Sequence, residues 1–187
     1  PDSDLALQEK LGKAYNSTSA HYYSQKEIDS FVKTGKELIK KNLGVNVTSF
    51  RWGNWALNSK AVAALEKNGF KIDSSATAGI RGHRHDGMKF DWSKVFYHYP
   101  WKMNKSNYQS VNGSSKLKQI PIATFGFLGR WIRADPAHSI LLEKGFDYYF
   151  EKADRSKKDF PFVVISHSSE ATYRDGKPTK VIQVTEE

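Results

Sequence analysis

The hydrophobic positions of residues 24–44 repeat with the period of an α-helix. Ser24 and Glu27 have the spacing of a capping box, in which each side chain bonds the backbone N–H of the other residue. Gly44 is the kind of residue that commonly follows the end of a helix. The pattern therefore predicts one amphipathic helix, whose apolar face carries Ile28, Phe31, Val32 and Ile39.

Beyond this helix, strand-like runs and helical patterns alternate. Residues 45–50 have the composition of a strand, and residues 61–68 form a short helical pattern that Asn58 or Ser59 can cap. Residues 70–73 form a second short strand. Strands that alternate with helices are typical of an α/β fold with parallel strands, and consecutive strands are then neighbours or near neighbours.

The middle of the chain is less regular. Residues 79–116 are rich in Gly, His, Ser, Asn and aromatic residues, and we expect a long loop insertion there. A strand is predicted over residues 117–125, kinked or confined to a sheet edge by Pro121. We interpret residues 1–187 as a single catalytic-type domain, with residues 1–23 as a loosely held arm.

The last predicted elements are a helix and a strand. Asp135 can cap a helix with Pro136 at its first position, Gly145 ends or interrupts it, and residues 146–158 continue as helix. The apolar run 162–165 is typical of a strand that is covered on both faces, as in a parallel sheet.

Three residues with chemical potential follow predicted strands: Arg51, Asp73 and His167. Because parallel strands end at one edge of a sheet, we expect these side chains to meet there. A carboxylate beside an imidazole fixes its tautomer and raises its pKa, which suits a general acid near neutral pH. An arginine can hold a second carboxylate through a bidentate pair. The simpler alternatives are a histidine that only bonds a loop carbonyl and a structural Arg51–Asp73 ion pair.

Two tryptophans stand beside this predicted edge. Trp52 and Trp55 surround Gly53 and Asn54 directly after Arg51. Exposed indole rings stack on the apolar faces of sugars and amide groups bond sugar hydroxyls, so this stretch fits a carbohydrate groove. The alternative is that both rings belong to the core.

These stretches resemble the polysaccharide deacetylases, the NodB-like enzymes similar to carbohydrate esterase family 4. The segment "FRWGNWALNSKAVAALEKNGFKIDSSATAG" resembles their third and fourth motifs, "LKQIPIATFG" resembles the strand that follows, and "VVISHSSE" resembles the last motif. The match spans roughly residues 45–185 with its order and spacing preserved.

The resemblance implies a partial or distorted (β/α) barrel and a metal-dependent hydrolase that removes acetyl groups from an amino-sugar polymer. It implies that His167 is the general acid, that Arg51 holds the carboxylate of the catalytic base and that Asp73 orients or tunes His167. Trp52, Trp55 and Asn54 would contact the substrate. The cofactor implied for the complete family domain is a divalent metal, with zinc as the expected ion.

The chain lacks two family motifs, a Thr-Phe-Asp-Asp strand end and a His-x-x-x-His pair. Both would precede residue 1, so we expect the chain to be the C-terminal part of a longer protein. A shorter, metal-free relative is the alternative. "RGHRHDG" offers His83, His85 and Asp86 as a substitute metal site, but a flexible basic loop is the favoured interpretation and no metal is assigned to this chain.

The composition excludes several classes of protein, site and partner. The 187 residues are 39% hydrophobic and 13% aromatic, which is enough to build a core. The absence of cysteine excludes disulfides, thiolate metal sites and a cysteine nucleophile. The net charge of +9 is spread along the chain without a nucleic-acid signature, so nucleic acid is not an expected partner, and no apolar stretch is long enough to make an integral membrane protein.

Two hypotheses for the function follow. The first is a polysaccharide deacetylase-like hydrolase with a polysaccharide substrate. The second is a catalytically inactive relative of the same fold that binds carbohydrate, and the two missing motifs would discriminate between them. The expected location is extracellular, periplasmic or the cell envelope, and the sequence does not fix the oligomeric state.

Overall fold

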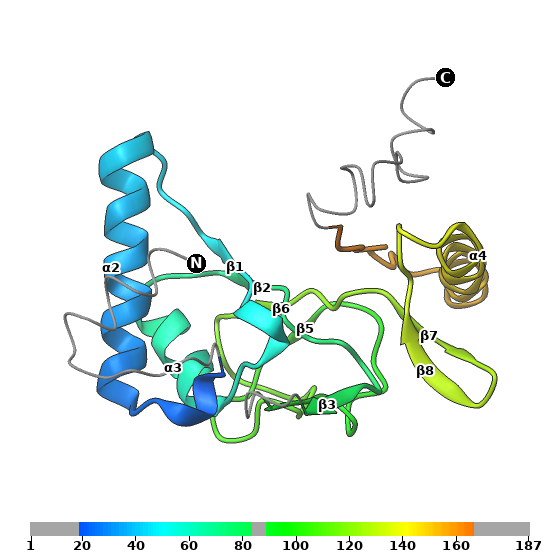
Figure 1. Cartoon of the computed structure of the whole chain (residues 1–187), viewed down its shortest axis with the longest axis horizontal. Coiled ribbons are helices and arrows are strands. Elements are labelled where there is room, and N and C mark those ends of the chain that lie inside the picture. The colour runs from blue at the N-terminus through cyan, green and yellow to red at the C-terminus, as the bar shows by residue number, and fades with distance from the viewer. Residues whose placement is uncertain (1–18, 84–88, 167–187) are drawn as a thin grey trace, which may run out of the picture.

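The computed structural model describes residues 19–83 and 89–166, and every structural statement below refers to these residues (Figure 1). They form a mixed α/β fold with three α-helices: α2 (Gln25–Leu43), α3 (Ser59–Lys67) and α4 (Ser139–Ser156). Two single-turn 3₁₀-helices, η1 (Ala20–Tyr22) and η2 (Gly53–Trp55), precede α2 and α3.

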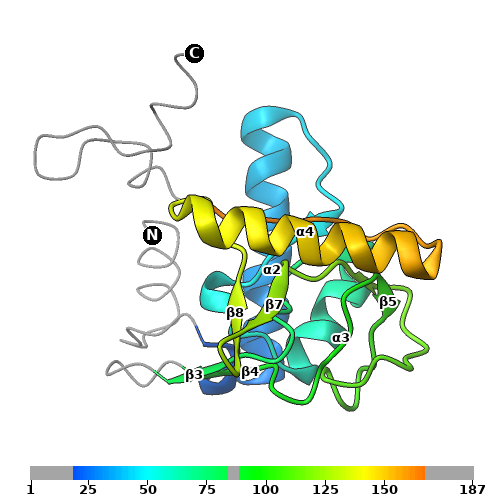
Figure 2. The ribbon, with the colours of Figure 1, turned by 90° about the vertical axis from the view of Figure 1, so that its right-hand side faces the viewer.

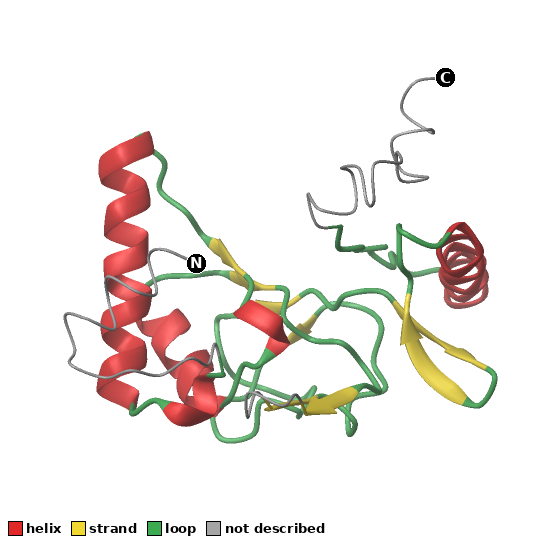
Figure 3. Cartoon of the chain, in the orientation of Figure 1, coloured by secondary structure: helices red, strands yellow, loops and turns green. Residues whose placement is uncertain are grey.

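A small sheet joins four short strands in the order β1-β2-β6-β5. The strands β1 (Ser49–Phe50), β2 (Ile72–Asp73) and β6 (Lys118–Gln119) run parallel, and β5 (Trp101–Lys102) is antiparallel to β6. Two hairpins pair β3 (Arg81–His83) with β4 (Lys89–Asp91), and β7 (Thr124–Phe127) with β8 (Arg130–Arg133). The α/β class and its parallel strands are present, whereas the described strands do not close a barrel (Figure 3).

The two N-terminal α-helices begin where the sequence predicts. Ser24 Oγ accepts from the Glu27 N–H at 3.3 Å and Glu27 Oε2 accepts from the Ser24 N–H at 2.8 Å, which completes the capping box. Gly44 ends α2 at φ 68°, in the left-handed region that glycine adopts without strain. Asn58 caps α3 through Oδ1, which accepts from the Ala61 N–H at 3.0 Å.

The core has a larger and a smaller part. The larger part lies between the sheet, α2 and α3, and its largest fully buried side chains include Trp92, Ile28, Leu57, Leu65, Met103 and Leu117. The smaller part joins the β7–β8 hairpin to α4, which lies across the hairpin (Figure 2), through Ala123, Phe125, Ala134 and Tyr149.

Within the region expected to be a loop insertion, residues 79–83 and 89–116 are described. They contain β3, β4 and β5, and they contribute Phe90, Trp92, Val95, Trp101 and Met103 to the larger part of the core. Residues 19–23 are likewise packed rather than loosely held, because Ala20 is fully buried and its N–H donates to the Ala56 carbonyl at 2.9 Å. Residues 1–18 lie outside the described part of the chain.

The predicted strand 117–125 is two strands. Proline has no N–H to donate to a sheet, and the break falls at Pro121 between β6 and β7. The first part stays in the parallel sheet, and the second turns away into an antiparallel hairpin with β8. Its turn residues, Leu128 and Gly129, both have positive φ, as a two-residue hairpin turn of the right twist requires.

The helix predicted from Asp135 begins later, at Ser139. Asp135 Oδ1 accepts from the Ala137 N–H at 3.0 Å and closes a turn ahead of the helix. Gly145 does not interrupt α4. An added Cβ there would lie 2.6 Å from Ala134 Cβ, so glycine lets the helix approach the hairpin closely.

The predicted buried strand 162–165 has no regular secondary structure, lies outside the sheet and is only half-buried. The Ala123 N–H donates to the Val163 carbonyl at 2.8 Å, and Phe162 packs against Tyr149 with ring centroids 5.5 Å apart. Its apolar residues cover α4 and the hairpin instead of completing a parallel sheet.

Candidate functional site

The site begins where β1 and β2 end side by side. The register pairs Phe50 with Asp73, so Arg51 leaves β1 directly beside the end of β2. Arg51 is exposed, and its guanidinium donates from Nε to the Ser74 carbonyl at 2.9 Å and from Nη2 to Ser74 Oγ at 3.1 Å. The parallel register therefore brings together two of the three residues that the sequence places at one edge.

Asp73 lies beneath this edge and is fully buried. Its Oδ1 accepts from the Ser75 hydroxyl at 2.8 Å, and its Oδ2 accepts from the Ser75 N–H at 2.9 Å. Gln119, the next residue across the sheet, adds a third bond: in the amide orientation that satisfies both groups, its nitrogen donates to Asp73 Oδ2 at 2.5 Å. The Arg51 guanidinium bonds Ser74 rather than this carboxylate, so the structure does not show the alternative of a structural Arg51–Asp73 ion pair.

Burial decides the electrostatics of Asp73. The loss of hydration raises the pKa of its carboxyl to about 7, against the opposing effects of the Ser75 and Gln119 hydrogen bonds and the Arg51 charge. Desolvation also lowers the pKa of the Arg51 guanidinium, and the charge of Asp73 counteracts this shift. The edge thus combines an exposed cation with a carboxyl whose proton is exchanged near neutral pH.

Asp91 also accepts hydrogen bonds from the serine two residues later, but its pKa shifts in the opposite direction. Its Oδ1 accepts from the Ser93 N–H at 2.9 Å and from the Ser93 hydroxyl at 2.6 Å, which repeats the Asp-x-Ser arrangement of Asp73 and Ser75. Burial is the largest single effect on its pKa and raises it, but the two Ser93 hydrogen bonds and the charges of Arg81 and Lys94 together outweigh burial and bring the pKa below its usual value. The pKa values of the two carboxyls differ because Asp73 is buried and Asp91 is closer to solvent, and not because of the Asp-x-Ser motif.

This contrast predicts opposite pH dependences of stability. Asp73 binds its proton more tightly in the folded state, so its contribution favours folding near pH 4 and is lost as the pH rises towards 7. The unfolding free energy of Asp73→Asn relative to wild type should therefore increase over this range, by up to about 4 kcal/mol. Urea titrations at several pH values measure the difference.

Asp91→Asn is the matched control. The lowered pKa of Asp91 makes its charge stabilising above the unfolded value, and this stabilisation disappears as the pH falls through the folded pKa. The variant should be less stable than wild type at pH 7 and should approach it in acid. Parallel difference profiles for the two variants would contradict the burial argument.

The tryptophans after Arg51 pack against other side chains. Trp52 is only 8% exposed and lies against Phe50, with ring centroids 5.7 Å apart, so it is a core residue and not an open stacking surface. Trp55 is half-buried: the Arg133 guanidinium covers its ring at 4.7 Å and Phe90 meets it edge-on at 5.2 Å. Their expected role as exposed sugar platforms does not match these positions.

The loop that carries these tryptophans is strained. Asn54, which is exposed, and Trp55 have φ values of 50° and 58°, and such left-handed conformations are uncommon for residues other than glycine, especially bulky ones. The Trp92 indole holds the loop, because Nε1 donates to the Trp55 carbonyl at 3.0 Å. The loop conformation therefore depends on the core beneath it.

His98 lies in a buried cluster that no local pattern in the sequence indicates. Tyr149 accepts from the Thr124 N–H at 3.1 Å, so its hydroxyl proton is available to His98 Nδ1 at 3.3 Å. The other ring nitrogen then carries the proton and faces the Tyr148 hydroxyl at 3.5 Å. Burial, with a smaller contribution from Lys152, lowers the pKa of His98 to about 4 and keeps the ring neutral.

The remaining predicted residues lie partly outside the described chain. His167, His85 and Asp86 are outside it, and of His83 only the backbone, in β3, is described. Within residues 19–83 and 89–166, no group of three or more His, Cys, Asp or Glu side chains could hold a metal ion. These residues therefore do not fit the metal that the family resemblance implies.

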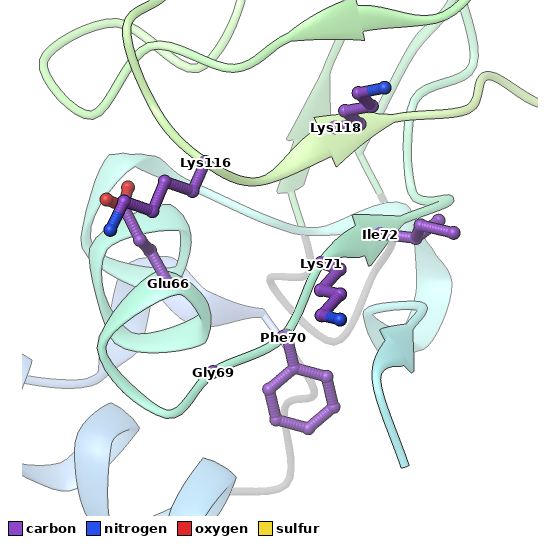
Figure 4. A pocket seen from close by; sticks show the side chains of 7 residues that line it. All are labelled: Glu66, Gly69, Phe70, Lys71, Ile72, Lys116 and Lys118. Atoms are coloured by element: carbon purple, nitrogen blue, oxygen red, sulfur yellow. The ribbon is translucent and has the colours of Figure 1, made fainter.

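A cavity of about 520 Å³ lies at the opposite end of the parallel strands (Figure 4) and is lined by Glu66, Gly69, Phe70, Lys71, Ile72, Lys116 and Lys118. Lys71 and Lys118 point to different sides of the strands, and Lys116 extends towards Glu66. A binding pocket usually has a few polar groups that converge on the ligand, and these side chains do not converge.

Fold and site together define a mixed α/β protein with an arginine and a buried aspartate at the ends of neighbouring parallel strands. No family model matches the chain, and no curated protein matches it. Among solved structures the chain is similar to one described as "putative polysaccharide deacetylase from Mycobacterium smegmatis", with 16% identity and a TM-score of 0.40. The match covers 73% of this chain and 41% of that one. A likeness at this level is not evidence for a shared function.

Within the described residues, no helix has the length and apolar character needed to cross a membrane.

Proposed function

We propose that this chain belongs to a polysaccharide deacetylase-like hydrolase that removes acetyl groups from an amino-sugar polymer. The observation that carries the proposal is the meeting of two motif residues at one sheet edge: Arg51 follows β1, and Asp73 ends the adjacent parallel strand. The motif resemblance of residues 45–185 suggests the chemistry. The strand register supports the expected placement of Arg51 beside Asp73.

Arg51 would hold the carboxylate of the catalytic base. Its Nε and Nη2 are engaged by Ser74, so the side chain is fixed while Nη1 remains available for a carboxylate. Guanidinium groups bind carboxylates strongly and stay charged, so such a contact would keep the base ionised. The base itself is not among the motifs matched in this chain.

His167 would protonate the leaving amine. The segment before it is anchored by the bond between Val163 and Ala123, and Ala123 belongs to the connection between β6 and β7. Asp73 would tune the site through its charge and through Ser75 and Gln119, because its own oxygens are buried under these partners. No ligand for the metal of the family is assigned among the described residues.

The test uses the protein at its natural full length and an acetylated amino-sugar hexamer, with released acetate as the readout. We expect turnover by wild type and a loss of roughly 10- to 100-fold in Arg51→Ala, the usual cost of removing a group that positions a catalytic residue. Arg155→Ala is the control, because this arginine is 80% exposed on α4.

Three outcomes are informative. Equal activity of Arg51→Ala and wild type would contradict the assigned role of Arg51. Absence of acetate release from wild type would contradict the hydrolase. Binding of the hexamer without any release would favour the inactive carbohydrate-binding relative instead.

A further inference from the structure

An aromatic strip leads away from the Arg51 edge along the β7–β8 hairpin. We define it by Trp55, Trp131 and Phe96. Arg133 covers the Trp55 ring at 4.7 Å, and Trp131 lies two residues earlier in β8, hence on the same face of the strand. Phe96 follows, with its ring centroid 5.9 Å from that of Trp131. The strip therefore continues the loop after Arg51 onto the hairpin, on the face turned away from α4.

Trp131 is held in place by buried partners. Its indole stacks on the His98 imidazole, with ring centroids 5.3 Å apart and an interplanar angle of 26°. Gly79 lies against the same ring: a Cβ at this residue would stand 2.5 Å from Trp131 Cγ. His98 is itself fixed by the two tyrosine hydroxyls of α4. The indole is thus preorganised, as a binding surface requires.

The outer end of the strip is open. Phe96 is 61% exposed, although it packs on Trp131. Gly126 pairs with Trp131 across the hairpin, and an added Cβ there would meet nothing within 4 Å. A large exposed phenyl ring beside a rigid indole contributes little to folding, because much of its apolar area remains in water. Phe96 is therefore free to contact a ligand beside the Trp131 ring.

The charges around the strip are mainly positive. Lysine and arginine side chains lie on the segments that carry or flank the two rings, namely Lys94, Arg130 and Arg133. The carboxylates on these segments are engaged: Asp91 accepts from Ser93, and Asp135 lies 3.8 Å from Arg133 and 3.5 Å from His138. The whole chain carries +9. A cationic ligand is therefore repelled and a neutral or acidic one is not.

We infer that Phe96 and Trp131 form a subsite that binds still-acetylated stretches of the polymer and disfavours deacetylated ones. This inference rests on the proposed function. N-acetylated amino sugars are neutral, whereas each deacetylated residue carries an ammonium group near neutral pH. The aromatic rings would contact the apolar faces of the sugars, and the surrounding cations would reject the charged product. The strip would thus direct unmodified polymer towards the Arg51 edge.

Binding is measured by calorimetry at low and at physiological salt with two probes, an N-acetylated amino-sugar hexamer and its fully deacetylated form. The acetylated hexamer should bind more tightly. The preference should shrink with salt, because the Debye length falls to about 8 Å at physiological ionic strength. Phe96→Ala should weaken binding of the acetylated hexamer by about tenfold, which corresponds to the loss of one aromatic contact.

Phe150→Ala is the matched control, since Phe150 is 66% exposed on α4, away from the strip, and should leave binding unchanged. Unaltered binding in Phe96→Ala, no binding of the acetylated hexamer to wild type, or equal binding of the two hexamers would each overturn the inference. So would tighter, Phe96-dependent binding of a single-stranded DNA hexamer, which would assign the strip to nucleic acid. Acetate release is measured separately, so failure of the subsite and failure of the hydrolase are distinguishable.

Discussion

Replacing His167 by alanine in the full-length protein is expected to slow acetate release by about 10²–10⁴-fold, the usual contribution of a general acid. The amine that leaves the tetrahedral intermediate needs a proton, and the resemblance assigns its transfer to this histidine. Wild-type turnover should fall at alkaline pH as the imidazole loses its proton, and the variant should lack this limb of the profile.

Stability should change little in this variant. The segment before His167 is anchored by Phe162 against Tyr149 and by the Val163 carbonyl, so the histidine is not needed to hold it. His138→Ala is the control, because that side chain is 67% exposed at the start of α4. Near-normal turnover in His167→Ala, or a fall in melting temperature large enough to explain the loss, would show that His167 is structural.

Trp92→Ala should reduce the free energy of unfolding by about 3–5 kcal/mol, the range for truncating a large buried aromatic side chain. Trp92 is fully buried, meets Tyr108 edge-on with ring centroids 5.0 Å apart and donates to the Trp55 carbonyl. Since small domains are stable by only about 5–15 kcal/mol, this loss approaches the whole stability. Denaturant titration measures it.

Trp92→Phe separates the two contributions of this side chain. It keeps most of the apolar volume and removes the N–H donor to Trp55, so the expected cost is about 1–3 kcal/mol, mainly from the unpaired carbonyl. Because this bond holds the strained loop after Arg51, the variant should also lose activity in the acetate assay. Equal stability of Trp92→Ala and wild type would contradict the assigned place of Trp92 in the core.

The local elements could be predicted from the sequence because their causes lie within a few residues. The capping box of α2 needs only Ser24 and Glu27, and the start of α3 needs only Asn58 and its own N–H groups. The meeting of Arg51 and Asp73 was predictable for a related reason: parallel strands that follow one another end at one edge.

Predictions that depended on distant partners failed. The run 162–165 has the composition of a buried strand, but its neighbours are α4 and the hairpin rather than sheet strands. The sequence of residues 79–116 indicates a loop, because no local period reveals that Trp92 and Trp101 are buried in the core. The burial of Trp52 against Phe50 likewise depends on tertiary packing, which the residues around Arg51 do not indicate.

Sequence alone determined where the capped helices α2 and α3 begin, where the chain turns and that Asp73 and Asp91 are each followed by a serine two residues later. Asp73 and Asp91 are identical at that level: each bonds the N–H and hydroxyl of the second following residue. The tertiary structure decided that one is sealed from water beside Gln119 while the other remains near solvent and basic residues. Hydration depends on everything packed around a group, so the fold, and not the motif, raises one pKa and lowers the other.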